Sequence, residues 1–228
     1  MAKVWFNNQP FEAILFDLDG VIIDSNEPII NFWKREAAQF GIELTETTLI
    51  QHVYGVPARD TVNRVFDKLS FEEKEALLKR LADFEANLDY QEISGAVDFV
   101  KFLKKIEVDT ALVTSSKRPK VDIALNKIGL TDAFTVFVTA DLIKKGKPDP
   151  ECYRTAAEKL GKHPEHCLVF EDAISGVKAA MAAGASCIGV QQGSIAEMLR
   201  SVGTVGIVSD YLKISFQQNG EDLKLIIK

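Results

Sequence analysis

Two carboxylates, Asp17 and Asp19, stand one residue apart directly after the apolar run at 13–16. A short apolar run that ends in polar residues and glycine is typical of a buried parallel strand leading into a loop. In open α/β sheets, ligands bind in the crevice outside the carboxyl ends of the strands. Two acidic groups crowded there are unfavourable unless a cation or a reaction uses them. The pair therefore points to a Mg²⁺-dependent phosphoryl-transfer site.

Polar residues also follow three later predicted strands. They are Thr114 with Ser115 and Ser116, Lys147 in a lysine-rich loop, and the pair Glu171 and Asp172. Phosphoryl transfer needs a nucleophile, a hard cation held by oxygen ligands, and fixed donors for the phosphate oxygens. It also needs a general acid that protonates the leaving oxygen and can then activate water. The four positions supply each of these parts once.

From about residue 95 onward, helical and strand patterns alternate along the chain. Such alternation is typical of βαβ units around a parallel sheet. Helices are expected at 96–106, 121–128, 151–160 and 176–183, and strands at 110–114, 135–139, 167–170 and 187–190. The predicted fold class is therefore α/β, with a doubly wound, Rossmann-like and mainly parallel sheet.

Residues 26–92 differ, because helical patterns dominate there and no strand pattern interrupts them. Helices are expected at 28–40, 45–53, 59–69 and 71–88. A helical block inserted after the first strand suggests a separate module over the strand ends. The predicted division is a core domain of residues 1–25 and 94–228 and a helical cap domain of residues 26–93.

The two ends of the chain carry weaker strand patterns. Residues 4–6 are expected to form an edge strand that turns at 7–10. The tail at 213–228 alternates weakly around Asn219 and Gly220, and Asn-Gly is a strong hairpin signal. Both segments are expected to be peripheral to the core.

The 228 residues carry a net charge of −6, which argues against nucleic acid or an anionic membrane as the main partner. The three cysteines and three histidines are unclustered, which argues against a zinc site or a Ser-His-Asp triad. No apolar run reaches the length of a membrane span, and the first five residues lack a signal-peptide core. A cytoplasmic protein is expected, and nothing demands more than a monomer, although a dimer stays open.

The four motifs, in this order, resemble those of the haloacid dehalogenase superfamily of aspartate-nucleophile phosphotransferases. The resemblance implies that Asp17 is the nucleophile and a Mg²⁺ ligand, and that Asp19 is the general acid and base with its backbone carbonyl on the metal. It implies that Thr114 and Lys147 hold the transferring phosphoryl group. Asp172 would complete the metal site, with Glu171 bound directly or through water. An acid at Asp19 argues against the dehalogenase and phosphonate-cleaving branches.

Within that superfamily, the chain resembles most the sugar phosphatases and β-phosphoglucomutase. Residues 55–60 resemble a cap loop whose arginine, here Arg59, often faces the substrate. Ser116 and Lys117 match residues that help hold a second phosphate in the mutase, and Ser115 is expected to contact substrate beside them. Two departures favour hydrolysis. Ile29 stands where the mutase has a catalytic histidine, and the mutase's cap arginine aligns with Ala58.

The predicted function is that of a Mg²⁺-dependent phosphatase acting on a small phosphorylated metabolite, a sugar or polyol phosphate, through an aspartyl-phosphate on Asp17. A β-phosphoglucomutase-like isomerase is the first alternative, since it shares the first half-reaction. A non-catalytic protein that binds a phosphate ligand is the second, although such proteins usually lose Asp17 or Asp19. The sequence leaves open which phosphomonoester is bound.

Overall fold

The computed structural model describes residues 3–220 and 222–228, so residues 1 and 2 of the predicted core domain and Glu221 of the tail lie outside the described part. Within that part, a parallel sheet has the strand order β5-β4-β3-β6-β7-β8. Its strands are β3 (Ala13–Phe16), β4 (Asp109–Val113), β5 (Val136–Val138), β6 (Cys167–Glu171), β7 (Ser186–Val190) and β8 (Gly206–Val208). This order confirms the predicted doubly wound α/β fold, because the chain winds outward from a central strand in both directions.

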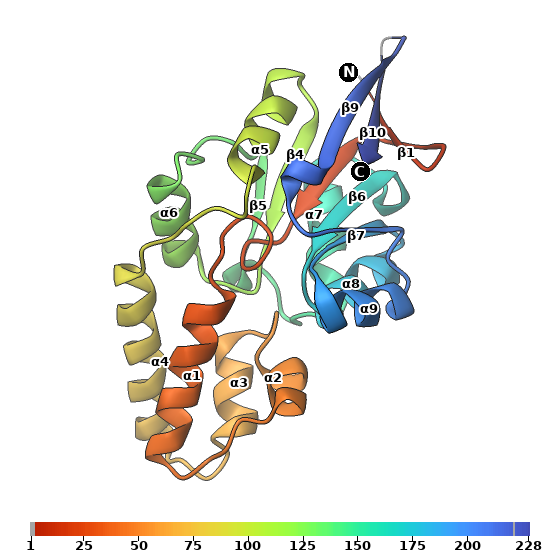
Figure 1. The fold of residues 1–228 in the computed structure, drawn as a ribbon. Coiled ribbons are helices and arrows are strands. Elements are labelled where there is room, and N and C mark those ends of the chain that lie inside the picture. Colours follow the sequence, from red (N-terminus) through yellow and green to blue (C-terminus); the bar gives the residue numbers. More distant parts are fainter. Residues whose placement is uncertain (1–2, 221) are drawn as a thin grey trace.

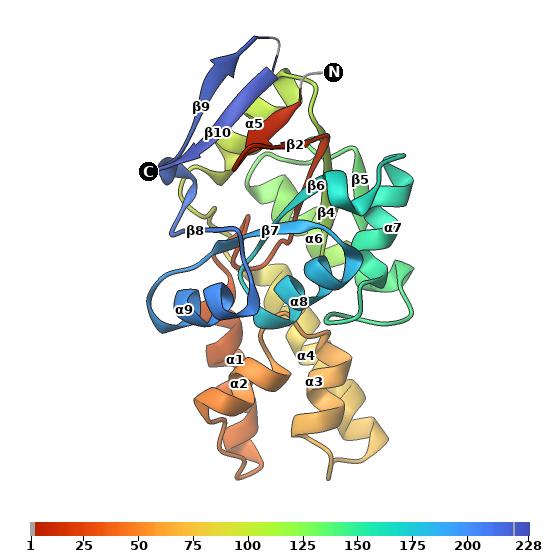
Figure 2. The same ribbon diagram turned by 90° about the vertical axis from the view of Figure 1, so that its right-hand side faces the viewer.

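Helices cover both faces of this sheet (Figure 1, Figure 2). One face packs against α5 (Ala96–Lys105) and α6 (Arg118–Lys127), and the other against α7 (Glu151–Lys159), α8 (Ile174–Ala183) and α9 (Gly193–Val202). In β3, Ile14 and Phe16 join the first core, whereas Ala13 and Leu15 join the second. Burial on both faces explains why this strand is an unbroken apolar run rather than an alternating one.

Four consecutive helices follow β3 and lie beyond the carboxyl ends of the strands (Figure 1). They are α1 (Asn26–Gln39), α2 (Glu46–His52), α3 (Ala58–Val65) and α4 (Phe71–Asn87). The sequence sets their starts: Thr45 caps α2, and Ser70 forms a capping box with Glu73 at α4. The helices share their own apolar core, which includes Phe32, Trp33 and Leu77. We refer to residues 26–93 as the helical segment.

The two ends of the chain form a second sheet with the order β2-β1-β10-β9 in the described residues. Its strands are β1 (Val4–Phe6), β2 (Gln9–Phe11), β9 (Ile214–Asn219) and β10 (Asp222–Ile227). The predicted hairpin of the tail is confirmed, but the prediction of an edge strand at 4–6 is wrong. β1 lies between β2 and β10, pairing antiparallel with the former and parallel with the latter.

This second sheet also belongs to the core, contrary to the peripheral position expected for both ends. Val4 and Leu225 are each 1% exposed and join the same apolar cluster as the central strand β3. The ring of Phe216 stacks on Phe99 of α5 at 5.6 Å between centroids. The terminal strands therefore cover α5 and close one face of the molecule.

The region between 191 and 213 holds elements that the sequence analysis did not assign. These are α9, β8 and a short 3-10 turn at Tyr211–Lys213; two further turns span Ala140–Leu142 and Pro164–His166. The helix α9 begins after Gln192 with no side-chain cap, and its first residue is Gly193. Glycine at the start and a strand of three residues give little local signal, so tertiary packing decides this region.

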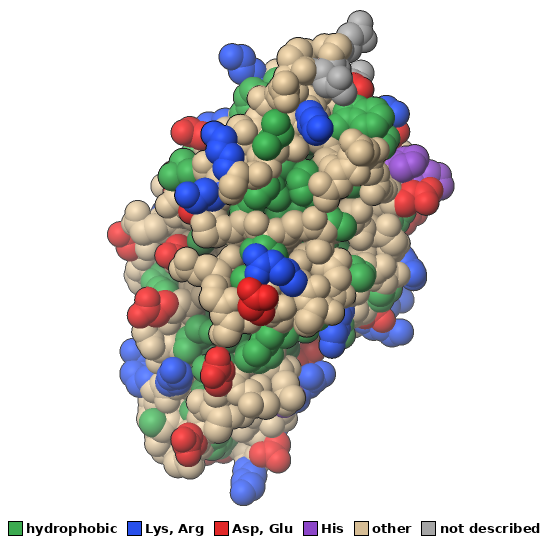
Figure 3. All heavy atoms as spheres, turned by 45° about the vertical axis from the view of Figure 1, so that its right-hand side comes forward, with side chains coloured by type: hydrophobic (Ala, Val, Ile, Leu, Met, Phe, Trp, Pro, Cys, Tyr) green, Lys and Arg blue, Asp and Glu red, His purple; other side chains and the backbone are tan. Residues whose placement is uncertain are grey.

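The surface is of mixed charge on the face seen in Figure 3, where acidic and basic side chains alternate around small hydrophobic patches. This face therefore lacks the continuous basic stripe that nucleic-acid binding uses. None of the helices in the described ranges is both long enough and apolar enough to cross a membrane.

Candidate active site

Neighbouring parallel strands bring three predicted site residues to one edge of the sheet. Asp17 follows β3, and its backbone N–H donates to the carbonyl of Phe170 in β6 at 3.0 Å. Thr114 follows β4, and its N–H donates to the carbonyl of Val138 in β5 at 2.9 Å. Glu171 is the last residue of β6. Each side chain thus stands where a strand ends, at the edge where open α/β sheets bind ligands.

Lys147 enters the same edge from the loop before α7. Its Nζ lies 2.6 Å from Asp17 Oδ1 and 2.6 Å from Glu171 Oε1, and it donates to the carbonyl of Val113 at 3.1 Å. Burial alone would lower the pKa of Lys147, but the two carboxylates outweigh burial and raise it. The ammonium therefore stays charged and fixed beside Asp17.

Glu171 holds this lysine and the following turn in place. Its Oε1 also accepts from the hydroxyl of Tyr153 at 2.8 Å, and its Oε2 accepts from the backbone N–H groups of Asp172 and Ala173 at 3.0 and 3.1 Å. A side chain at Gly176 would collide with this carboxylate, because an added Cβ would lie 1.8 Å from Oε1. Each oxygen of Glu171 thus accepts two donors within the protein.

Asp17, Glu171 and Asp172 form a buried acidic cluster, in which one oxygen of each lies within 4.8 Å of the others. Burial raises the pKa of Asp17 to about 7, and burial with the neighbouring carboxylates raises the pKa of Asp172. Among the described residues, Lys147 is the one cation that forms an ion pair with any of these three carboxylates. Excess buried negative charge on hard oxygen ligands suits a divalent cation such as Mg²⁺.

Gly20 allows the loop after β3 to pass close to this cluster. Its φ is +74°, and an added Cβ would lie 2.1 Å from Asp172 Oδ2 and 2.2 Å from Asn26 Nδ2. Asn26, the first residue of α1, donates to Asp172 Oδ2 at 2.7 Å. The start of the helical segment is thereby joined to the acidic cluster.

The carboxylate of Asp19, the predicted general acid and base, lies in a separate hydrogen-bond network. Its Oδ1 accepts from Ser25 and from Lys120, the latter at 2.7 Å, and its Oδ2 accepts from Ser116 at 2.8 Å. Burial would raise the pKa of Asp19, but Lys120 and the two hydroxyls more than offset it and lower the pKa. In this arrangement Asp19 is an ionised carboxylate whose two oxygens are both engaged.

Lys120, which the sequence analysis did not single out, connects Asp19 to the helical segment. It lies on α6 with its side chain 8% exposed, and its Nζ is 2.7 Å from Asp19 and 3.0 Å from Glu85 Oε1 on α4. These two carboxylates raise the pKa of Lys120 above its ordinary value although burial opposes them. One buried ammonium therefore joins the loop after β3, the core helix α6 and the helical segment.

The loop at 53–57 of the helical segment rests on the strand ends. Ser115 donates its hydroxyl to the carbonyl of Gly55 at 2.9 Å, and Ser175 donates to the carbonyl of Tyr54 at 3.4 Å. A side chain at Gly55 would approach Ser175 Oγ to 2.9 Å, and one at Gly146 would approach Pro57 Cγ to 2.8 Å. The loop thus touches the residues beside Thr114, Lys147 and Asp172, and Asp17 is only 4% exposed.

Two of the other residues predicted to contact substrate, Ser116 and Arg59, have partners of their own. Ser116 donates its backbone N–H to Thr114 Oγ1 at 3.0 Å, in addition to its bond with Asp19. Lys117 is exposed at the start of α6. Arg59 forms a two-pronged ion pair with Glu75 of α4, at 2.5 and 3.1 Å, and is half exposed. Substrate contact by these residues stays a prediction.

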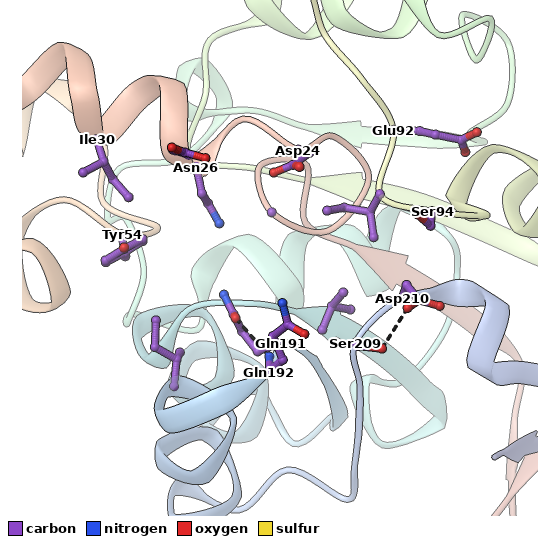
Figure 4. A pocket seen from close by; sticks show the side chains of 15 residues that line it. Asp24, Asn26, Ile30, Tyr54, Glu92, Ser94, Gln191, Gln192, Ser209 and Asp210 are labelled. Atoms are coloured by element: carbon purple, nitrogen blue, oxygen red, sulfur yellow. Dashed lines mark hydrogen bonds between the residues drawn. The ribbon is translucent and has the colours of Figure 1, made fainter.

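A cavity of about 640 Å³ opens next to the acidic cluster (Figure 4). Gly20 and Asn26 lie on its wall, and so does Tyr54 of the loop that covers the strand ends. Gln191 and Gln192, which follow β7, line the opposite side. The cavity therefore lies between the helical segment and the carboxyl edge of the sheet.

Ser25, Asn26, Lys120 and Tyr153 are among the site residues that sequence reasoning missed. For Tyr153 there was a signal, since a tyrosine on the buried face of a helix needs a partner for its hydroxyl. For Asn26 the signal was its position at the start of the first inserted helix. Lys120 gave none, because it stands among other cations in the run at 117–120.

The sequence pattern of the haloacid dehalogenase-like hydrolases matches residues 14–190. Phosphorylated carbohydrates phosphatase of Thermotoga maritima is 33% identical over 177 residues, 76% of this chain and 82% of that protein. Hexitol phosphatase A of Escherichia coli is 32% identical over 212 residues, 92% of this chain and 97% of that protein. Beta-phosphoglucomutase of Bacillus subtilis is 30% identical over 199 residues, 80% of this chain and 84% of that protein.

The fold itself is shared with solved structures of the same group. The crystal structure of a hydrolase from Pseudomonas syringae superposes with a TM-score of 0.77 at 26% identity, covering 88% of this chain and 96% of that chain. The parallel sheet order, the residues gathered at its edge and these similarities all agree. The chain is an enzyme that belongs to the haloacid dehalogenase-like hydrolase family.

Proposed function

We propose that this enzyme is a Mg²⁺-dependent phosphatase that hydrolyses a small phosphomonoester, of the sugar or polyol phosphate class, through an aspartyl-phosphate on Asp17. The observation that carries the proposal is the buried contact of Asp17 with Lys147 inside a cluster of three carboxylates. Two of the similar proteins are named as phosphatases of phosphorylated carbohydrates and hexitols. The substrate class is taken from that similarity.

The residues present support a two-step reaction. Lys147 occupies Oδ1 of Asp17, and no side-chain donor in the described residues is bonded to Oδ2. In the first step a carboxylate oxygen of Asp17 forms a bond to phosphorus, the ester P–O bond breaks, and the leaving oxygen takes a proton from Asp19. In the second step water attacks phosphorus, gives its proton to Asp19, and the P–O bond to Asp17 breaks.

Lys147 and Thr114 are proposed to hold the oxygens of the transferring phosphoryl group, since both lie buried at the edge where Asp17 stands. Asp17 and Asp172 would hold Mg²⁺ together with the backbone carbonyl of Asp19, and Glu171 would bind it directly or through water. The bound cation would neutralise charge on the phosphate oxygens during transfer. Asp19 is ionised in this arrangement, so before it protonates the leaving oxygen it must take up a proton from solvent and release at least one of its donors, Ser25, Ser116 or Lys120.

We further propose that residues 26–93 act as a cap domain over a core of residues 1–25 and 94–228. The contacts of the loop at 53–57 with both sides of the strand edge support this role. A cap that closes over the reacting groups excludes water and shapes the space for the leaving group.

Mutase activity is the less favoured alternative, although one similar protein is a β-phosphoglucomutase. Ile29, which stands where the mutase has its histidine, packs against the apolar core of the helical segment. A hydrocarbon side chain neither donates nor accepts a proton. A non-catalytic role is disfavoured as well, because Asp17 and Asp19 are both present.

Release of inorganic phosphate from a panel of sugar, polyol and other small phosphomonoesters tests the proposal, with Mg²⁺ and with EDTA. The expected result is Mg²⁺-dependent turnover that is absent in Asp17→Asn. Turnover that appears only after a sugar bisphosphate is added, with isomerised product and no phosphate, would favour the mutase. Asp17→Asn behaving like the parent in every assay would favour a non-catalytic role.

A further inference from the structure

The terminal sheet ends on one side at β9, which has no neighbouring strand beyond it in the described residues (Figure 2). Its sequence, ISFQQN, holds no charged residue and no proline. The opposite edge of this sheet, β2, has three residues and includes Pro10, and the two edges of the parallel sheet, β5 and β8, also have three residues each. Among these sheet edges, β9 is therefore the long one, and it lacks the charges and proline that commonly keep an edge from pairing with another chain.

The backbone hydrogen bonds of the β9–β10 hairpin show which groups of β9 face outward. The carbonyl of Lys213 accepts from the N–H of Lys228 at 2.9 Å, in the same register that pairs the two strands. Along an antiparallel pair, residues that bond to the partner strand alternate with residues whose N–H and C=O point away from it. The outward backbone groups of β9 are therefore those of Ile214, Phe216 and Gln218.

The other side of β10 gives the same alternation independently. The N–H of Leu223 donates to the carbonyl of Lys3 at 3.0 Å, so residue 223 is turned toward β1. Its neighbour Lys224 is then turned toward β9, where its partner in the register is Gln217. Among the described residues, no backbone hydrogen bond from outside the hairpin reaches the three outward positions.

Two of the outward residues also carry apolar side chains that the fold covers only in part. The ring of Phe216 lies 5.6 Å from that of Phe99 and 5.0 Å from that of Phe102 between centroids, yet Phe216 is only half-buried. Ile214 is half-buried as well, and Leu212, just before the strand, is 68% exposed. An added strand would cover hydrocarbon here and bond to the open backbone groups at the same time.

A second copy of β9 matches this edge. In an antiparallel pair about a twofold axis at Phe216, Ile214 of each copy lies opposite Gln218 of the other, and Phe216 lies opposite Phe216. Each of these pairs exchanges two hydrogen bonds, so that every outward group of β9 finds a partner. No like charges meet across the axis, because the strand carries none.

Charges beside the strand agree with the same pairing. Lys213 and Lys228 are opposite each other at one end of the hairpin, and Asp222 is paired with residue 219 at the other end. In the twofold arrangement, Lys213 of one copy falls opposite residue 219 of the second copy, which places the two lysines beside the end that carries Asp222. The contact therefore brings opposite charges together at both of its ends.

We propose that β9 is a self-association edge, through which two copies of this chain pair antiparallel about a twofold axis at Phe216. The pairing joins the two terminal sheets into one continuous sheet and is isologous, as a twofold contact requires. Because each copy contributes one strand, the interface is small and the association depends on protein concentration. The proposal does not involve the candidate active site, so it holds for any reaction the enzyme catalyses.

Sedimentation velocity over a series of protein concentrations tests whether the chain self-associates. We expect the weight-average mass to rise from that of one chain toward that of two. A mass of one chain at every concentration would overturn the proposal and leave the edge to a different extended partner.

A charge placed on β9 tests whether association uses this edge. Gln217 is exposed, and Gln217→Lys puts two like charges at diagonal positions across the axis, which should raise the concentration of half-association by about tenfold or more. Gln39→Lys, at an exposed position of α1, makes the same change in net charge and should leave association unchanged. Urea unfolding should give the parental midpoint for both variants. Equal association of Gln217→Lys and the parent, or an equal shift in Gln39→Lys, would contradict the assignment.

Cysteine cross-linking tests the register. The twofold pairing places Ser215 of one copy opposite Gln217 of the other, at a distance that a disulfide can span. A mixture of Ser215→Cys and Gln217→Cys should therefore form more covalent dimer on oxidation than either variant alone. The parent is the control, because its three cysteines are buried. If the mixture forms no more dimer than the single variants, the proposed register is wrong.

Discussion

Two buried lysines, Lys147 and Lys120, each bridge a pair of carboxylates, but they join different parts of the molecule. Lys147 connects Asp17 with Glu171, and all three side chains come from the sheet edge and its loops. Lys120 connects Asp19 with Glu85, so that its bridge runs from the core to the helical segment. The Lys147 bridge therefore lies within the sheet edge, whereas the Lys120 bridge joins the core to the helical segment.

The two bridges also differ in how far their side chains are exposed to solvent. The side chains around Lys147 are between 1% and 6% exposed, whereas Asp19 and Glu85 are 24% and 17% exposed. A fully buried pair depends on its partners, because losing one leaves an unpaired charge away from water. A partly hydrated bridge is easier to break and form again. The comparison indicates a fixed site around Asp17 and an adjustable link to Asp19.

Replacing Lys147 is expected to have the largest effect. In Lys147→Met, Asp17 and Glu171 lose their shared ammonium, and the metal-free protein should lose about 3–5 kcal/mol of unfolding free energy. Phosphate release should fall by about 10³-fold or more, since a fixed donor to the phosphoryl group is gone as well. Urea unfolding and the phosphate assay measure the two losses. If Lys147→Met keeps most of its unfolding free energy and most of its phosphate release, the Lys147 bridge is not essential to the site.

The second-largest difference between the two bridges is expected in the pH dependence of the unfolding free energy. Burial raises the pKa of Asp17 to about 7, so its contribution to stability is full below the ordinary pKa of an aspartate and is lost as the pH rises through about 7. The pKa of Asp19 is lowered instead, so its contribution is present above the ordinary value and is lost only as the pH falls below it.

The metal-free protein should therefore lose about 1–4 kcal/mol of unfolding free energy between about pH 5 and 8, and Mg²⁺ should reduce that slope. Urea unfolding in EDTA and in Mg²⁺ at a series of pH values provides the measurement. Asp17→Asn is the control, because it removes one of the two carboxyl groups whose pKa is raised and should reduce the metal-free slope, leaving the part that comes from Asp172. A metal-free stability that rises over this interval would contradict the account.

Replacing Lys120 should have a smaller effect than replacing Lys147. In Lys120→Met, Asp19 keeps its bonds to Ser25 and Ser116, and Glu85 can gain water. We expect a loss of about 1–3 kcal/mol in stability and of about tenfold in kcat, with KM changed less. Lys120→Arg keeps the charge and should recover part of kcat. Equal losses in Lys120→Met and Lys147→Met would remove the difference between the two bridges.

The smallest effect should come from Glu85, the outer end of the second bridge. Glu85→Gln alone should change stability by about 1 kcal/mol or less, because the residue is partly hydrated. Glu85→Gln is also expected to lower kcat slightly. In the Lys120→Met background it should not change kcat any further, because the link from the helical segment to Asp19 is already broken. The double-mutant cycle on kcat measures that coupling. Additive effects would show that Glu85 does not influence Asp19 through Lys120.

Much of the site's scaffold was predictable from the sequence, because short apolar runs ending in polar residues mark the carboxyl ends of parallel strands. The runs before Asp17, Thr114 and Glu171 placed these residues at one edge without knowledge of tertiary contacts. Their roles in a reaction remain proposals. The parallel sheet followed from the alternation of helices and strands after residue 95, whereas the order of its strands comes from the structure.

What the sequence did not indicate depends on contacts between distant segments. Lys120 is buried only because α4 lies against α6, which the cationic run at 117–120 does not reveal. The inner position of β1 depends on β10, whose Leu223 pairs with Val4. A strand pattern three residues long does not indicate which strand near the other end of the sequence will pair with it.

The pairing of β1 with β10 has a consequence for how the chain is made. Trp5 and Asp222, which hydrogen bond at 2.7 Å, are 217 residues apart. On the ribosome, β1 can turn back into a hairpin with β2 early, but one side of it waits until nearly all of the described chain has emerged. The pairing of β1 with β10 therefore forms late, and it forms slowly compared with pairing between strands that are close in the sequence. During translation the early hairpin therefore carries an open hydrogen-bonding edge, which can pair with another chain until β10 covers it.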